Sequence, residues 1–203
     1  MYFRISQADV DNVNVDGDEI SNGFEFANIL VGNKFLLYKT RDSVLSGGVD
    51  VIIPTEFNDN VGRLQTLLMF KRDFPLYLQD AFTFTPYLSA AAWKRWYSVQ
   101  ASAGVDLITR ASKLEGEDFE LRFKYSAAAG VNVPIPTSPT VFIEFDGYTL
   151  ATATSMKKTD LFVTPGVRFG EKFSPGLGVQ IPISGPTSEI ANVSFLTDVQ
   201  LRF

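Results

Sequence analysis

The chain has 203 residues, no cysteine, no histidine and a formal net charge of −5 at pH 7. The lack of cysteine excludes disulfides and thiolate sites, and the lack of histidine excludes the most common general base and every catalytic triad that depends on it. An acidic chain without a basic stretch lacks the positive field that binds phosphates, so we expect no nucleic-acid partner. We also expect no enzyme activity, no cofactor and no metal.

Apolar and polar residues alternate along most of the chain in segments of about ten residues, which is the pattern of half-buried β-strands. The segments predict ten strands, near residues 2–10, 24–39, 43–54, 81–91, 96–109, 118–132, 139–152, 160–169, 175–184 and 191–203. Short connections near 40–42, 92–95, 134–138 and 170–174 alternate with longer ones near 11–23, 55–80, 110–117, 153–159 and 185–190. Short turns at one end and longer loops at the other are typical of an outer-membrane barrel.

The last segment shows the alternation most clearly. Between residues 192 and 203, five of six odd positions are apolar, but only one of six even positions is. The chain ends on Phe203, with Leu201 and Val199 on the same face, and this ending resembles the signal that the bacterial barrel-assembly machinery reads. We expect these three residues to face lipid and to form the assembly signal, and Asp198 and Arg202 to face the interior.

Periodicity alone does not say which face points outward, because a soluble lipocalin-type barrel also alternates, with its apolar face around a ligand. The polar face favours a membrane barrel, since it carries small residues and charges of both signs, as a wet interior would. We predict one domain over residues 1–203: an all-β, antiparallel transmembrane β-barrel of the bacterial outer membrane, with about ten strands in this chain and up to twelve in a longer form.

The first residues lack the basic region and apolar core of a signal peptide, and no apolar run of about 18 residues encodes a transmembrane helix. Because the last strand looks built for export, we expect the natural chain to start before Met1. The expected partners are outer-membrane lipid, the barrel-assembly machinery and a small-molecule solute. The alternatives are a plugged structural or adhesive outer-membrane barrel and a soluble ligand carrier.

Several segments resemble the outer-membrane transporters of the MetA-pathway of phenol degradation family. They are Gly23-Phe24-Glu25-Phe26 leading to Lys34-Phe35-Leu36-Leu37, the run 48–55 (GVDVIIPT), the run 85–88 (TPYL), the run 142–147 (FIEFDG), the run 164–169 (TPGVRF) and the run 176–184 (GLGVQIPIS). The resemblance covers most of the chain from about residue 23 onward. It implies a channel or transporter for small, often apolar or aromatic, molecules across the outer membrane.

Charged residues on the polar face are the candidates for lining the interior. They are Lys34, Asp50, Asp106, Glu120, Arg122, Lys124, Glu144, Asp146, Arg168, Asp198 and Arg202. A charge inside a narrow barrel must pair or meet water, so these residues either contact a permeating solute or form a structural ion-pair network. We favour the network, because Arg122 and Lys124 lie one hairpin away from Glu144 and Asp146. The spacing of the two carboxylates also suits ion pairing better than glycoside hydrolysis.

Three other segments have a specific interpretation. Residues 56–80 contain leucines at helical spacing and form either a loop that narrows the mouth or an extension at the rim. Residues 12–23 start like a calcium loop, but Gly23 stands where the bidentate glutamate is needed, which favours an acidic loop. Trp93, Trp96 and Tyr97 surround one short turn, as in the aromatic belt at a membrane interface.

Overall fold

The structure is a computed structural model of the chain. It describes residues 2–4, 7–10, 13–15, 18–20, 23–26, 28–55, 81–110, 119–135, 139–151, 159–170, 173–185, 188 and 194–201. In residues 2–26 and 194–201, and at Arg110 and Phe173, only the backbone is described. The excursion at 56–80 and the C-terminal Phe203 lie outside the described residues.

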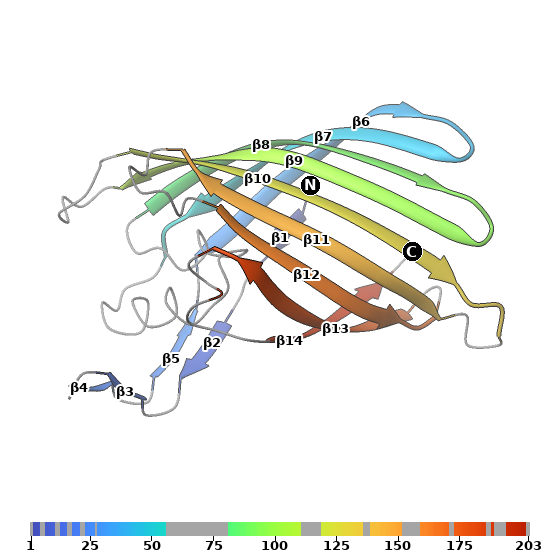
Figure 1. Ribbon diagram of the computed structural model, residues 1–203. Coiled ribbons are helices and arrows are strands. Elements are labelled where there is room, and N and C mark those ends of the chain that lie inside the picture. The colour runs from blue at the N-terminus through green and yellow to red at the C-terminus, as the bar shows by residue number, and fades with distance from the viewer. Residues whose placement is uncertain are drawn as a thin grey trace. The chain divides into compact units, whose positions relative to one another are not determined.

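Strands make up nearly all of the described chain (Figure 1). Five short ones come first: β1 (Tyr2–Arg4), β2 (Gln7–Val10), β3 (Val13–Val15), β4 (Asp18–Ile20) and β5 (Gly23–Phe26). The longer ones follow: β6 (Ile29–Lys39), β7 (Ser43–Ile53), β8 (Ala81–Trp93), β9 (Tyr97–Arg110), β10 (Phe119–Asn132), β11 (Thr140–Leu150), β12 (Thr159–Arg168), β13 (Phe173–Ser184) and β14 (Ser194–Leu201). The prediction of an all-β chain is therefore confirmed.

The largest sheet has the strand order β1-β6-β7-β8-β9-β10-β11-β12-β13-β14, so that β6 to β14 follow one another in chain order. The pairings of β1 with β6 and of each neighbouring pair from β11 to β14 are antiparallel. β1 and β14 stand at the two ends of this order.

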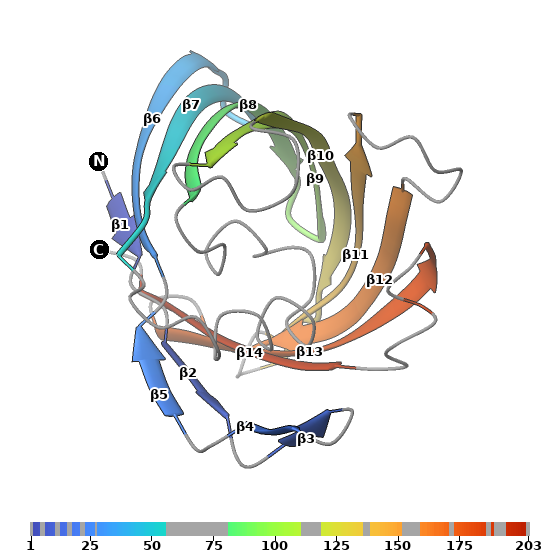
Figure 2. The ribbon, with the colours of Figure 1, turned by 90° about the vertical axis from the view of Figure 1, so that its left-hand side faces the viewer.

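The N-terminal part differs from the prediction. One strand was expected at 2–10 and one at 24–39, with a loop between them. Instead β2 pairs with β5, and β3 pairs with β4, in two small two-stranded sheets (Figure 2). Asp16 and Gly17 stand between β3 and β4, and an Asp-Gly pair between short alternating runs favours a two-residue hairpin. The described segments on either side of this region, Gln7–Val10 and Gly23–Phe26, are strands and not the helices that flank a calcium loop.

The chain divides into two compact units, which are described separately. Unit 1 comprises residues 1–34, 48–86 and 105–122, and unit 2 comprises residues 35–47, 87–104 and 123–203. In unit 1 the side chain of Asn28 is fully buried, and its Oδ1 accepts the backbone N–H of Thr55 at 2.9 Å. This bond holds the start of β6 beside the end of β7 and marks the break between β5 and β6.

In unit 2, two aromatic rings lie over glycines on neighbouring strands. A Cβ added at Gly147 would overlap the ring of Tyr125, and one added at Gly166 would overlap the ring of Phe142 and approach the carbonyl of Leu177. The missing side chains therefore let the rings lie flat on the sheet, an arrangement that shields glycines in β-sheets.

Candidate functional site

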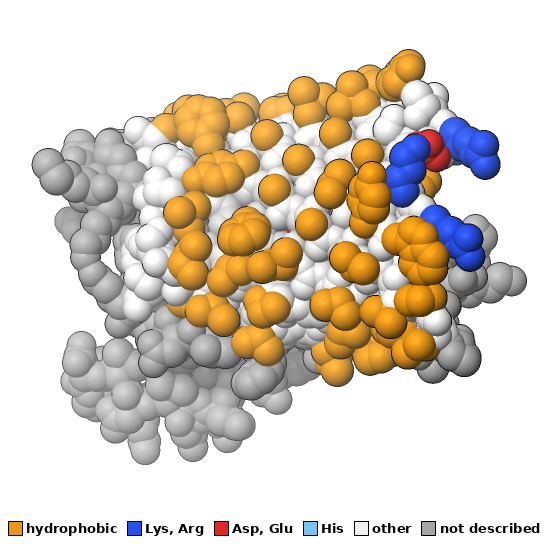
Figure 3. Space-filling view, turned by 45° about the vertical axis from the view of Figure 1, so that its right-hand side comes forward, with side chains coloured by type: hydrophobic (Ala, Val, Ile, Leu, Met, Phe, Trp, Pro, Cys, Tyr) orange, Lys and Arg blue, Asp and Glu red, His pale blue; other side chains and the backbone are white. Residues whose placement is uncertain are grey.

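The strands bury polar side chains and expose apolar ones. In β8, which carries the run AFTFT, Phe82 and Phe84 are exposed while Thr83 and Thr85 are buried. β11 of unit 2 shows the same alternation, since Phe145 is exposed and the next residue, Asp146, is buried. Figure 3 shows hydrophobic side chains over most of the described surface on one side.

The buried side chains show that the usual distribution of polar and apolar residues is reversed. Among the described side chains, the buried polar residues are Asn28, Ser46, Thr83, Thr85, Asp106, Arg122, Asp146, Asp160, Thr164, Ser174 and Gln180. The buried hydrophobic residues are only Ile52, Ala81, Ile108, Tyr148 and Phe162. A soluble protein has the opposite distribution, because its fully buried residues are mostly aliphatic.

Three buried side chains form a hydrogen-bonded cluster in unit 1, which we call the Asp106 cluster. Thr85 on β8 donates its hydroxyl to Asp106 Oδ1 at 2.7 Å. Arg122 on β10 donates Nε to Asp106 Oδ2 at 2.8 Å and Nη2 to the same oxygen at 2.5 Å. Asp106 and Arg122 are 1% and 5% exposed, so the opposite charges are almost removed from solvent and each needs the other.

The buried face of unit 2 carries uncharged polar groups in adjacent strands. The register sets Glu144 of β11 opposite Thr164 of β12, and Gln180 of β13 opposite Ser194 of β14. Thr164 and Gln180 are 2% and 1% exposed. Within the described part of the chain, the hydroxyl of Thr164 and both polar atoms of the Gln180 amide make no hydrogen bond. Groups of this kind usually hold water or a bound molecule in native proteins.

Aromatic rings lie among these polar groups. The guanidinium of Arg168 is 5.5 Å from the centre of the Phe142 ring, within the range of a cation–π contact. Tyr148 and Phe162 pack edge to face with their ring centres 6.1 Å apart, and both are buried. The face therefore offers ring surfaces as well as hydrogen-bonding groups.

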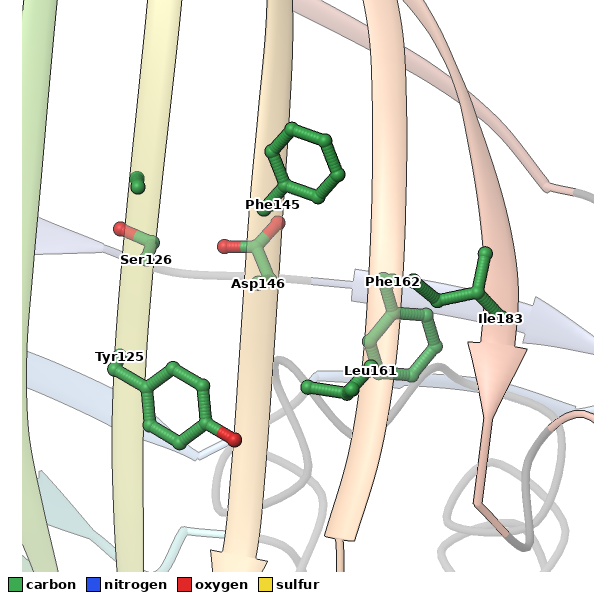
Figure 4. Close-up of a pocket in the computed structure, with 8 residues that line it drawn as sticks. Tyr125, Ser126, Phe145, Asp146, Leu161, Phe162 and Ile183 are labelled. Atoms are coloured by element: carbon green, nitrogen blue, oxygen red, sulfur yellow. The ribbon is translucent and has the colours of Figure 1, made fainter.

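A separate hollow of about 180 Å³ opens between β10, β11, β12 and β13 (Figure 4). Its lining is mainly apolar and consists of Tyr125, Ser126, Ala127, Phe145, Asp146, Leu161, Phe162 and Ile183. The register of β12 on β13 shifts at this place, between Leu161 and Phe162, which leaves Ile183 as an extra residue of β13. Such a bulge re-aims side chains and widens the local spacing, which explains a hollow here.

The structure places the predicted interior residues as follows. Asp106, Arg122 and Asp146 are buried, Asp50, Glu120, Lys124, Glu144 and Arg168 are half-buried, and Lys34 is exposed. Asp198 lies opposite Gly176 in the β13–β14 pairing, but its side chain is outside the described part, as is all of Arg202. Of the predicted assembly signal, the backbone of Val199 and Leu201 belongs to β14, and nothing more of that signal is described.

Sequence reasoning missed two aspects of the site. It did not identify Asp106 on β9, which the structure shows as an ion-pair partner of Arg122. The candidates chosen from the sequence were all charged, so they did not include Thr83, Thr164 and Gln180. The period-two pattern places these three residues on the polar face as well.

Comparison with protein-family models, with curated protein sequences and with solved structures finds no match for the chain. No helix in the described ranges is long and apolar enough to cross a membrane. In those ranges, acidic residues also form no group of three or more that could hold a metal ion.

Proposed function

We propose that the chain is a β-barrel of the bacterial outer membrane through which small molecules pass. The observation that carries this proposal is the inversion of the strands, with large apolar side chains exposed and polar side chains buried. Lipid would cover the apolar side chains, and the polar face would line the interior of the closed barrel. A soluble ligand carrier needs the reverse arrangement.

The extent of the exposed apolar surface supports a lipid environment. Twenty-four large hydrophobic residues of the described part are between 37% and 62% exposed. At about 150–250 Å² for each large side chain, they together present roughly 2,000 Å² to the surroundings. Moving that area out of water is worth on the order of 50 kcal/mol.

The strand lengths fit a bilayer. β12 has 10 residues and β10 has 14, which at about 3.4 Å per residue gives about 34–48 Å. Strands tilted by about 45° would cover about 24–34 Å along the membrane normal, close to the apolar band of about 25 Å on outer-membrane barrels.

The composition of the buried face supports small solutes with both ring and hydrogen-bonding groups. Phe142 offers a ring, and Thr164 and Gln180 offer polar atoms that no described protein group uses. The resemblance to the MetA-pathway of phenol degradation family points in the same direction, so small aromatic alcohols are the first solutes to test.

The proposal is tested by purification and reconstitution. We expect the protein to require detergent, to show heat-modifiable mobility on gels, and to make liposomes swell in small aromatic alcohols faster than protein-free liposomes do. Monomeric protein that stays in solution without detergent would overturn the membrane proposal. Folded, reconstituted protein that gives no swelling and no conductance would instead indicate a plugged structural barrel.

A further inference from the structure

Two turns of unit 2 bring together cations and aromatic rings, which we call the turn surface. It consists of Lys39, Arg41, Trp93, Lys94, Arg95, Trp96 and Tyr97, from the β6–β7 and β8–β9 connections. All seven side chains are exposed. Figure 3 shows Lys and Arg side chains gathered at one end of the visible face, next to hydrophobic side chains and one acidic group.

Hydrogen bonds hold the two turns side by side. The backbone N–H of Trp93 donates to the carbonyl of Asp42 at 2.9 Å and links the two turns, while that of Lys94 donates to the carbonyl of Tyr97 at 2.8 Å and closes the β8–β9 turn. The Lys94 ammonium also contacts the carboxylate of Asp42, at 2.5 Å. The cations are therefore held on a fixed backbone platform rather than on independent loops.

The turn surface is positive in an acidic protein. Its four cations stand against the single carboxylate of Asp42, which gives a net charge of +3. The whole chain carries −5, so all other residues together carry −8. This difference marks the turn surface as a specific feature, because an average segment of this chain would be negative.

The cations remain available to a ligand. Lys94 is protonated at neutral pH even at the ordinary lysine pKa of 10.5, and the hydrogen bond and charge of Asp42 raise its pKa further. The guanidinium of Arg95 lies 5.0 Å from the centre of the Trp96 ring, where it keeps its donors while the ring holds it in place. Trp93, Trp96 and Tyr97 are 37%, 48% and 50% exposed.

We propose that the turn surface binds the anionic headgroups of phospholipids and so fixes which ends of the strands lie at the phospholipid leaflet. Aromatic rings of this kind settle between headgroup and hydrocarbon, and neighbouring cations then reach the phosphate layer. A nucleic-acid ligand fits less well, since four cations on two adjoining turns form no extended groove. This inference rests on the membrane location proposed above.

The chain supplies its own probe, because Trp93 and Trp96 are its only two tryptophans. Their fluorescence in reconstituted protein is quenched by lipids that carry bromine on the acyl chains near the headgroup. Brominated phosphatidylglycerol diluted in plain phosphatidylcholine, and the reverse mixture, together give the relative association of the two lipids at the turn surface. We expect about a fivefold preference for phosphatidylglycerol at low salt. It should almost vanish at 1 M salt, where the Debye length is about 3 Å.

A charge series makes the test specific. Asp42→Asn raises the net charge of the turn surface to +4 and should increase the preference to about tenfold, while Lys94→Gln with Arg95→Gln lowers it to +1 and should leave about twofold or less. The matched control is Lys157→Gln with Lys158→Gln, which removes two charges from the β11–β12 connection and should leave the preference unchanged.

The outcomes separate the two proposals. If neither brominated lipid quenches the tryptophans, the membrane location fails and this inference fails with it. If both lipids quench equally at low salt, or if the preference does not follow the charge series, the headgroup site is wrong while the membrane location stands. A preference that the control variant lowers as much as the turn variant does would also overturn it.

Discussion

The Asp106 cluster allows a sharp test of whether the buried charges are structural. Arg122→Met removes the guanidinium that donates Nε and Nη2 to Asp106 Oδ2, and it leaves a carboxylate that is 1% exposed without the opposite charge of that guanidinium. Breaking one partner of a buried ion pair costs about 3–5 kcal/mol. For a domain of this length, that corresponds to a melting temperature lower by about 6–20 °C.

The double variant Asp106→Asn with Arg122→Met should recover most of this loss. It removes the buried charge together with its partner, and the asparagine oxygen can still accept the Thr85 hydroxyl. Arg122→Lys should fall between wild type and Arg122→Met, because an ammonium keeps the charge but lacks the planar pair of donors.

The assay is heat-modifiable gel mobility together with circular dichroism melting in detergent, and reversal potentials in planar bilayers. Lys124→Met is the matched control, since it removes a half-buried cation two residues away on the same face of β10. If Arg122→Met shifts the reversal potential but leaves the melting temperature unchanged, the pair lies in water and the structural interpretation is refuted. If Lys124→Met lowers the melting temperature as much, the effect is not specific to the Asp106 cluster.

Three further predictions follow from single contacts. Gly166→Ala should destabilise the protein by about 1–3 kcal/mol, and Gly147→Ala should destabilise it by less, as measured by thermal melting. A Cβ at Gly166 would meet the carbonyl of Leu177, which is backbone and cannot move aside. The nearest atoms to a Cβ at Gly147 belong to the Tyr125 ring, which can turn away. Thr164→Val and Gln180→Leu should leave stability unchanged or slightly raised but slow the swelling of liposomes in aromatic alcohols, and unchanged swelling would exclude these groups from the solute path. Because the pKa of Lys94 is raised, its contact with Asp42 is complete below the ordinary lysine pKa of 10.5 and is lost as the pH rises through the higher pKa of the folded protein. Tryptophan fluorescence should change in that pH range. Lys94→Gln should abolish the change.

The strands of the large sheet were predictable from sequence, because successive side chains of a strand point to opposite faces of the sheet and so give the sequence a period of two. The predicted strand at 118–132 became Phe119–Asn132, and the one at 160–169 became Thr159–Arg168. Burial in β8 follows the letters of the run AFTFT residue by residue. The sequence of β8 therefore predicts which of its residues share a face.

The N-terminal hairpins were less predictable. The runs that form β3 and β4 are only three residues each, too short for periodicity to identify them against a loop. The informative signal was the Asp16-Gly17 pair between them, which favours a two-residue hairpin, whereas the sequence analysis expected an acidic loop over these residues.

The ion pair between Arg122 and Asp106 could not be predicted from the sequence, for a physical reason. Alternation fixes the face of a residue but not its neighbour across the strand, because the register depends on the connection between the strands. β9 and β10 are joined by residues 111–118, whose length alone does not set the register, and Asp106 therefore could not be identified as a partner of Arg122 in advance.

Charge alone does not identify the uncharged groups that we propose for the solute path of unit 2. A buried charge is easily recognised in a sequence as a candidate, because it must be paired. A solute path, however, needs groups that can release their ligand. Uncharged amides and hydroxyls suit this role, because they bind more weakly than ions do. Thr164 and Gln180 meet this requirement, and the register sets them beside Glu144 and Ser194 on adjacent strands. A one-residue slip of β12 would expose Thr164 and Phe162 and bury Val163 between them, so the alternation that gives the proposed barrel its apolar outer face also places Thr164 on the opposite face.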